Sequence, residues 1–170
     1  MTRENGIETP FYHLKLSHLR QIYCISVNRK VKDSNAVEQA LDVLKDNGTI
    51  WVCGTYHNIY SVEQCLIELG FQILNIVVWH KSDPPPTPYG GRLNFSAEYI
   101  VWARKHPKAI HCFHYDLLKE MNGGKEMSDV WKMPSTGNWE RTCGIHPTQK
   151  PLRLLYRIIK VCTEEGFTIL

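Results

Sequence analysis

Phe71-Gln72-Ile73-Leu74-Asn75-Ile76-Val77-Val78-Trp79 is a long apolar run that follows Gly70 and is succeeded by His80-Lys81. Its length and its β-branched residues predict a strand. Because nearly every position is apolar, we expect strand 71–79 to be buried on both faces, as in a sheet covered by helices on either side. Residues 49–53, Thr-Ile-Trp-Val-Cys, predict a second and shorter strand of the same kind.

Helix signals stand on both sides of strand 49–53. Residues 36–45 have apolar side chains at helical spacing, and Ser34 or Asn35 is suited to cap the helix they predict. Ser61, with Gln64 three positions later, has the pattern of a capping box and predicts a helix over 62–69. Alternating helices and strands with short links are typical of an α/β fold, here a mostly parallel sheet with helices on both faces.

A helix followed by a strand is predicted again near the end of the sequence. Residues 146–151, His-Pro-Thr-Gln-Lys-Pro, form a polar run stiffened by two prolines, and Pro151 suits the first turn of a helix. A helix is expected over 152–163, ended by Gly166 and followed by a strand over 167–170. Its expected buried face consists of Leu152, Leu155, Ile158, Ile159 and Cys162. By pattern alone, 146–151 is a connecting loop.

A proline-rich segment separates strand 71–79 from the strand predicted over 98–104. Residues 83–88, Asp-Pro-Pro-Pro-Thr-Pro, predict a stiff exposed loop, because proline donates no backbone hydrogen bond. Basic and aromatic residues bracket this loop, a mixture that suits a phosphate backbone and an unstacked base. They are Lys81, Arg92, Arg104 and Lys105, with Tyr89 and Phe95. A solvated rim is the alternative interpretation.

Residues 106–145 are read more coarsely. We expect a strand over 109–114, a short helix over 116–121 and an irregular, partly aromatic segment after Asp129. Trp131 and Trp139 are interpreted as residues that anchor loops to the core. Lys132 and Arg141 are candidate phosphate contacts.

Composition narrows the function classes. A chain of 170 residues with 43% hydrophobic and 22% charged residues is long enough for one domain with a core, and a net charge of +3 permits a nucleic-acid partner. The six cysteines form no C-x-x-C pair, which indicates reduced thiols. No apolar run approaches a membrane span and no secretory signal is present, so we expect a cytoplasmic protein.

Two regions receive no assignment. His111 and His114 are close enough in sequence to share a metal, but no further ligand stands near them, so no metal site is expected. Residues 1–33 lack a clean apolar period and are left without a function.

Three segments resemble one enzyme family. Residues 47–60, residues 76–105 with their proline-rich loop, and residues 146–152 with the following Gly-Phe-Thr-Ile-Leu are similar in order and spacing to DNA amino-methyltransferases. Those enzymes methylate adenine N6 or cytosine N4. The resemblance covers about residues 36–170 and is nearest to adenine-N6 enzymes of restriction-modification type, in which the catalytic segment precedes the cofactor glycine loop.

The resemblance implies a partial Rossmann-like core over 34–170 that uses S-adenosylmethionine and acts on a base rotated out of DNA. It assigns 106–145 to target recognition. The cofactor side would be formed by His146, Thr148, Gln149 and Lys150. The DNA contacts would be Lys81, Arg92, Arg104, Lys105, Lys132 and Arg141.

Two differences from the family limit which of its functional roles can be assigned to this sequence. The family's Asp-Pro-Pro-Tyr segment does not stand before Thr49, and residues 83–86 imitate it after the wrong strand, so no catalytic residue is named. The sequence also stops at Leu170, where the family continues into a glycine-rich turn. We therefore expect a truncated enzyme that is inactive alone, with a second chain or a homodimer as its candidate protein partner; whether another chain supplies the missing motifs is left open. The alternatives are a non-catalytic DNA-binding fragment and a decayed product without a ligand.

Overall fold

The computed structural model of the chain describes residues 21–26, 40, 42–88, 90–142, 144, 146 and 148–169. The elements follow in the order β1 (Gln21–Ser26), β2 (Thr49–Gly54), α2 (Ile59–Glu68), β3 (Gln72–Lys81), β4 (Ala97–Arg104), α3 (Tyr115–Met121), β5 (Val130–Met133), the 3-10 helix η1 (Asn138–Glu140), α4 (Leu152–Cys162) and β6 (Thr168–Ile169). The expected caps Ser34 and Asn35, and the aromatic Tyr89, lie outside the described residues. Among the described residues of the expected helix 36–45, Ala40, Asp42 and Val43 are helical.

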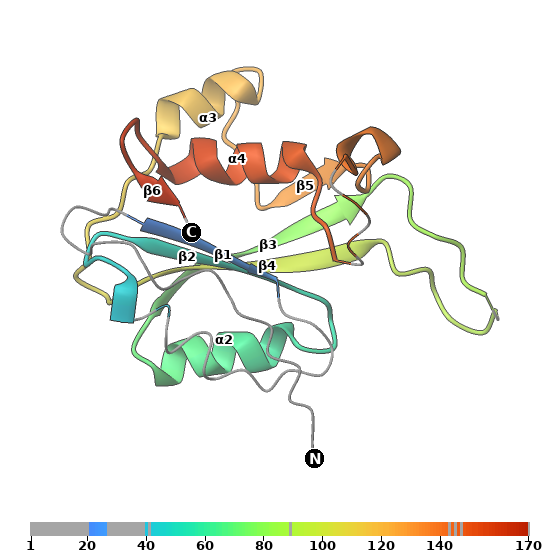
Figure 1. Cartoon of the computed structure of the whole chain (residues 1–170), viewed down its shortest axis with the longest axis horizontal. Helices are drawn as coiled ribbons and strands as arrows, with labels where there is room; N and C mark the ends of the chain where they lie inside the picture. Colours follow the sequence, from blue (N-terminus) through green and yellow to red (C-terminus); the bar gives the residue numbers. More distant parts are fainter. Residues whose placement is uncertain are drawn as a thin grey trace, which may run out of the picture.

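In the described part of the chain, six strands form one sheet in the order β5-β3-β4-β2-β1-β6 (Figure 1). β1 pairs in parallel with β2 and β6, and β3 pairs in parallel with β5. β4 lies antiparallel between β2 and β3. The expected strands 49–53 and 71–79 therefore share a sheet, as predicted, but a reversed strand separates them. β1 comes from the segment that the sequence pattern left unassigned.

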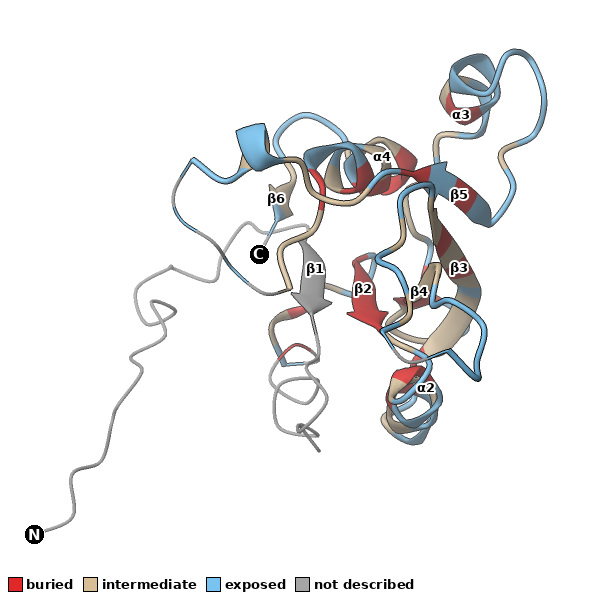
Figure 2. Ribbon diagram, turned by 90° about the vertical axis from the view of Figure 1, so that its right-hand side faces the viewer, coloured by how far each residue is buried: buried red, intermediate tan, exposed pale blue. Residues whose placement is uncertain are grey.

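Helices cover both faces of the sheet, as expected: α2 lies on one face, and α3 and α4 lie on the other (Figure 1). Alternate residues of β2 serve the two cores. Ile50 and Val52 pack in the cluster that includes α2, while Trp51 and Cys53 pack in the cluster that includes α3 and α4. Figure 2 shows the result, since β2 is buried along its whole length.

Strand β3 is less buried than its composition predicts. Only Val77 and Trp79 are buried, Asn75 is exposed, and the remaining positions are intermediate. The reason is position: β3 lies next to the short edge strand β5, and α2 packs beneath the middle of the sheet. The expectation of burial on both faces was wrong for most of this strand.

Helix α2 begins three residues earlier than the capping-box pattern predicts. The Ile59 N–H donates to the Thr55 carbonyl at 3.0 Å, and the Thr55 N–H donates to the Asn58 side-chain oxygen at 2.9 Å. This turn needs Gly54, because a Cβ there would lie 2.8 Å from that same oxygen. Ser61 therefore lies inside the helix rather than at its cap.

Helix α4 is present where predicted, but it ends at Cys162, with Thr163 extended, rather than at Gly166. Its buried residues are Leu154, Ile158, Val161 and Cys162. Leu152 and Ile159, which were expected to be buried, are exposed. The neighbouring apolar pairs 154–155, 158–159 and 161–162 do not reveal from sequence which member faces the core. Pro151 occupies the cap position just before the first helical residue.

Two further expectations changed in the region after β4. Residues 109–114 are not a strand but an irregular segment that leads into α3, which is present as predicted. The segment after Asp129 contains β5, which pairs with β3. Trp131 is buried as expected, whereas Trp139 is 73% exposed and anchors no core. Within the described part of the chain, no helix is both long and apolar enough to cross a membrane.

Candidate functional site

The carboxyl ends of β2, β3 and β5 lie at one edge of the sheet, because these three strands point the same way. The antiparallel strand β4 begins at this edge, where Ala97 pairs with His80. In open α/β sheets, ligands bind outside the carboxyl ends of the strands. We refer to this region, formed by the described residues within 54–58, 80–98 and 132–151, as the carboxyl edge.

Glu98 is the electrostatic centre of the carboxyl edge. Its two carboxylate oxygens meet Lys81 Nζ at 2.7 Å and Lys150 Nζ at 2.6 Å. All three side chains are at most 18% exposed, and both ammonium groups lie over the Trp79 ring, at 5.1 and 5.9 Å from its centroid. Two positive charges thus share one negative charge over an aromatic floor.

Burial alone would raise the pKa of Glu98. The hydrogen bonds and charges of Lys150 and Lys81 outweigh that effect, so the pKa of Glu98 lies below its ordinary value. The carboxylate is therefore ionised near neutral pH. It connects the end of β3, through β4, to the loop that precedes α4.

Glu140 organises the second part of the edge. Its side-chain oxygen accepts the Leu152 N–H at 2.7 Å and caps α4, where a negative charge is favourable. Its backbone carbonyl accepts the Gln149 side-chain N–H at 2.9 Å. Thr136 donates its hydroxyl to the Gln149 carbonyl at 2.8 Å. These bonds join the segment of Thr136 and Glu140 to Gln149 and Leu152 at the start of α4.

Asp83 anchors the start of the proline loop. Its carboxylate oxygen accepts the Ser135 N–H at 2.7 Å, and the Ser82 N–H donates to the Met133 carbonyl at 3.1 Å. A hollow of about 500 Å³ opens beside these contacts. It is lined by Asp83, Pro134, Ser135, Thr136, Gly137, Trp139, Glu140, Pro151 and Arg153.

The proline loop extends away from the sheet (Figure 1). At its return, four side chains form a column: Arg92 lies 4.8 Å from the Phe95 ring centroid, and Phe95 stacks on Tyr56 at 4.8 Å with 10° between the planes. Tyr56 in turn contacts His57 at 3.7 Å between centroids. Phe95 and Tyr56 are 43% and 40% exposed, so the edge of this aromatic column is accessible to a partner.

The expected cofactor residues occupy one loop but have different roles. Lys150 and Gln149 point to protein partners, Glu98 and Glu140 respectively. His146 is exposed, and its Nδ1 lies 3.3 Å from the Thr148 N and 3.2 Å from the Thr148 hydroxyl. The first pair shapes the loop, while the second pair presents polar atoms outward.

The expected DNA residues do not form one surface. Lys81, Arg92, Lys132 and Arg141 lie at the carboxyl edge, where Lys132 and Arg141 are exposed. Arg104 and Lys105 lie at the opposite end of β4. There, Arg104 donates to Gln72 Oε1 and to the Ala109 carbonyl, and Lys105 donates to the Leu44 carbonyl and pairs with Asp46. The structure thus separates these two cations from the other four.

Sequence reasoning missed Glu98, Glu140 and Tyr56. Glu98 lies opposite Trp79 in the antiparallel pairing of β3 and β4, and Tyr56 meets Phe95 only through the same arrangement. If the antiparallel pairing of β3 and β4 were known, Glu98 would be predicted to lie near Lys81. No local pattern in the sequence carries that information.

Comparison with known proteins identifies the family. A family model described as DNA methylase matches residues 34–170. The chain belongs to this DNA methylase family. Expected membership is thereby confirmed, and S-adenosylmethionine is the methyl donor of DNA methylases of this kind.

Among the curated proteins similar to this chain are two type II methyltransferases. The type II methyltransferase M2.MboI of Moraxella bovis is 52% identical over 134 residues, which are 79% of this chain and 49% of the relative. The type II methyltransferase M2.DpnII of Streptococcus pneumoniae is 49% identical over 135 residues, 79% of this chain and 50% of the relative. The chain thus spans about half the length of these curated relatives.

Solved structures confirm the Rossmann-like fold. M1.HpyAVI in complex with SAM superposes with a TM-score of 0.67 at 21% identity, covering 89% of this chain and 69% of that structure. The PvuII DNA methyltransferase, described as cytosine-N4-specific, superposes with a TM-score of 0.69 at 14% identity, covering 89% and 66%. At these identities the likeness establishes the fold alone.

Proposed function

We propose that this chain is the portion of a type II restriction-modification DNA methyltransferase that lies between the catalytic segment and the cofactor glycine turn. In the proposed reaction, a methyl group passes from S-adenosylmethionine to an exocyclic amino group, with adenine N6 favoured over cytosine N4. Two similar curated proteins are type II methyltransferases, which supports this assignment. The protein would act in the bacterial cytoplasm, and its described cysteines, Cys53, Cys65, Cys112 and Cys162, carry thiols rather than disulfides.

The residues of the 146–150 loop fit one wall of a cofactor site. His146 and Thr148 offer polar atoms at the surface, while Lys150 and Gln149 fix the backbone through Glu98 and Glu140. S-adenosylmethionine supplies the electrophilic methyl group. The chain's own contribution is to hold the loop, and thereby the cofactor side, in a fixed relation to the proline loop.

The observation that carries the DNA assignment is the column of Arg92, Phe95, Tyr56 and His57 at the carboxyl edge. Phe95 and Tyr56 support the exposed Arg92 guanidinium, whose plane offers a stacking surface for an unpaired base and a contact for its phosphate. Lys132 and Arg141 are proposed as additional phosphate contacts at the same edge. Residues 106–145 would then supply target recognition.

The experiment is fluorescence anisotropy of labelled duplex and single-stranded oligonucleotides with the chain. Replacement of Phe95 or Tyr56 by Ala should weaken binding to single-stranded DNA by about 1–3 kcal/mol, the value of one stacking platform. The matched control is Tyr60→Ala, which removes a tyrosine on α2 that is more exposed than Tyr56 or Phe95. Equal losses in the control and the two test variants would reject the column as the DNA surface.

Completion of the active site requires further motifs. A second copy of 1–170 lacks the same motifs, so we propose that a different polypeptide, or residues outside 1–170, supplies them. A homodimer is proposed only as an assembly state, and sedimentation of the chain with and without DNA tests it, because a monomer in both conditions would contradict association of two copies.

A further inference from the structure

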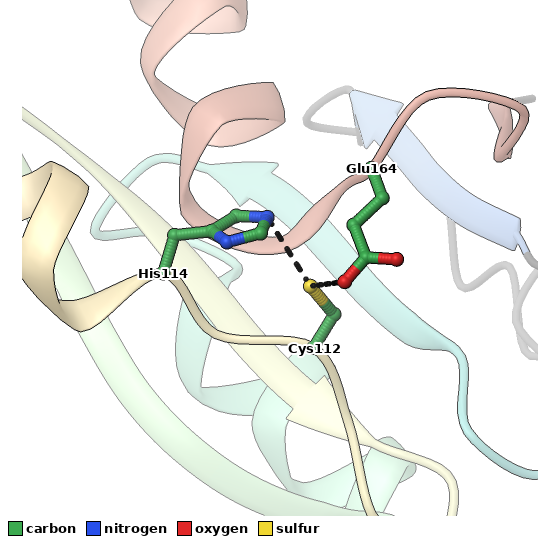
Figure 3. A group of neighbouring side chains, drawn as sticks. All are labelled: Cys112, His114 and Glu164. Carbon is green, nitrogen blue, oxygen red and sulfur yellow. Dashed lines mark hydrogen bonds between the residues drawn. The ribbon is translucent and has the colours of Figure 1, made fainter.

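Three chemically different metal-binding side chains meet at the opposite end of the sheet. Cys112 and His114 belong to the irregular segment before α3, and Glu164 follows the end of α4 (Figure 3). One ligand atom from each lies within 4.8 Å of the other two. Cys112 Sγ is 3.3 Å from His114 Nε2 and 3.8 Å from Glu164 Oε1.

These separations are close to those of a tetrahedral zinc site. Zinc bonds of about 2.3 Å to sulfur and about 2.0 Å to nitrogen or oxygen place such ligand atoms about 3.5 Å apart. The sulfur–nitrogen distance is slightly shorter than this and the sulfur–oxygen distance slightly longer. Small side-chain rotations would therefore bring all three atoms to bonding distance from one ion.

The backbone around the three residues is fixed without an ion. The His114 N–H donates to the Val161 carbonyl at 3.0 Å, which joins the start of α3 to the last turn of α4. The Thr163 hydroxyl donates to the Ile159 carbonyl at 2.7 Å and holds the residue before Glu164. An ion would meet ligands that are already close, so little ordering would oppose its binding.

A nucleophilic cysteine is the main alternative use of such a group. In a catalytic triad the carboxylate contacts the ring nitrogen of the histidine that faces away from the nucleophile. Here the Glu164 carboxylate contacts the sulfur itself, and His114 Nε2 also lies 2.9 Å from the Thr163 carbonyl oxygen. A carboxylate beside the thiol opposes formation of a thiolate unless a cation lies between them.

We propose that Cys112, His114 and Glu164 bind a divalent transition-metal ion of the zinc class. Thiolate and imidazole ligands together favour zinc over magnesium or calcium, which prefer oxygen. On binding, the Cys112 thiol releases its proton to solvent. Nε2, which carries a proton while it donates to the Thr163 carbonyl, also gives that proton to solvent, the neutral ring takes a proton at Nδ1 instead, and the Nε2 lone pair binds the ion. A water molecule completes four-fold coordination.

The position of this group indicates a structural role. β6 runs parallel to β1 and β2, so the loop that contains Glu164 enters the sheet at the amino end of β6, away from the carboxyl edge. An ion there would fasten the segment before α3 to the loop that delivers β6. It would stabilise the fold without touching the methyl-transfer site.

The first test is titration of the purified, reduced chain with Co²⁺, which reports a thiolate ligand by a sulfur-to-cobalt charge-transfer band in the near ultraviolet. The band should appear and should be displaced by Zn²⁺. Cys112→Ser should abolish it. Glu164→Gln should weaken binding by at least about tenfold, because loss of even a residue that supports a ligand typically costs 10–100-fold in affinity.

Glu165→Gln is the matched control, since it removes the neighbouring exposed carboxylate. The proposal is overturned if no charge-transfer band forms, if Cys112→Ser retains it, or if Glu165→Gln weakens binding as much as Glu164→Gln. Circular dichroism of each variant shows whether the fold is kept.

A second measurement does not depend on a variant that folds. Alkylation of the native chain, mapped by mass spectrometry, should become at least about tenfold slower at Cys112 when Zn²⁺ is added, because the thiolate is then coordinated. Cys65, which lies on α2, is the internal reference. Equal rates at Cys112 with and without Zn²⁺ would overturn the proposal.

Discussion

Lys150 Nζ lies 2.6 Å from Glu98 Oε2, so the loop before α4 is fastened to the start of β4, where Glu98 pairs with Trp79 of β3. Lys81 holds the other oxygen of the same carboxylate. One acidic residue thus joins two of the three segments through which the sequence resembles DNA methylases.

Replacement of Glu98 by Gln should destabilise the chain by about 3 kcal/mol, because it leaves two largely buried ammonium groups without a counter-charge. Urea unfolding followed by tryptophan fluorescence measures the change. Glu68→Gln on the exposed side of α2 is the control and should change stability by no more than about 0.5 kcal/mol. Similar losses of stability from both substitutions would show that Glu98 contributes no more to the free energy of unfolding than an exposed carboxylate does.

The same carboxylate predicts a pH dependence. The pKa of Glu98 lies below its ordinary value of 4.5, so its contribution to stability is fully present above that value. It is lost as the pH falls through the lower, folded-state pKa. The stability difference between the chain and Glu98→Gln should therefore be constant near neutral pH and shrink in acid. A difference that grows on acidification would contradict this sign.

Cys162 should be chemically inert in the native chain. It accepts the Trp51 indole N–H at 3.3 Å, and burial raises its pKa to about 12. Iodoacetamide at mildly alkaline pH should leave Cys162 unmodified until urea is added, as mass spectrometry can show. Cys162→Ala should cost about 1–3 kcal/mol, since the buried Trp51 donor loses its acceptor. Rapid native alkylation at Cys162 would refute the prediction.

The order of elements could be predicted because local patterns determine it. The runs at 49–53 and 98–104 and the helices near 116–121 and 152–163 each have a period or a stop signal of their own. β1 was missed because its apolar residues follow no clean period. The direction of β4, the Glu98 junction and the group of Cys112, His114 and Glu164 depend on which strands pair and which loops meet. Those are long-range outcomes of packing that no single segment contains.

Arg92 and Lys81 should differ in their effects on DNA binding. Arg92 is exposed beside Phe95, so Arg92→Ala should weaken binding to all sequences alike and reduce the salt slope by about 0.9, which is one phosphate contact. Lys81 was expected to do the same, but its ammonium is paired with Glu98. Lys81→Ala should therefore lower the free energy of unfolding. Its effect on the salt slope should be smaller than that of Arg92→Ala. Binding across a salt series, with Lys108→Ala as a remote control, separates the two roles.

The chain 1–170 alone should transfer no methyl group to DNA. Transfer requires an acceptor side chain at the target amino group, and no Asp-Pro-Pro-Tyr segment stands before Thr49 in this sequence. Asp83, in the similar Asp-Pro-Pro-Pro, uses its carboxylate to accept the Ser135 N–H at 2.7 Å. Asp83 therefore anchors the proline loop. Much of the rate enhancement of such a transfer comes from orienting the two substrates. That orientation would depend on groups that 1–170 does not itself supply.

The measurement is transfer of label from S-adenosylmethionine to duplex and single-stranded DNA by the chain and by Asp83→Ala. Neither protein should transfer label above background. The variant should lose about 0.5–1.5 kcal/mol of stability, the net value of one hydrogen bond, because water replaces Asp83 as the partner of the exposed Ser135 N–H. Asp83→Asn, which keeps an acceptor oxygen for that N–H, should restore most of the loss. If the chain transfers methyl groups and both variants fail, then Asp83 is the acceptor at the target nitrogen, and its bond to Ser135 positions a catalytic carboxylate.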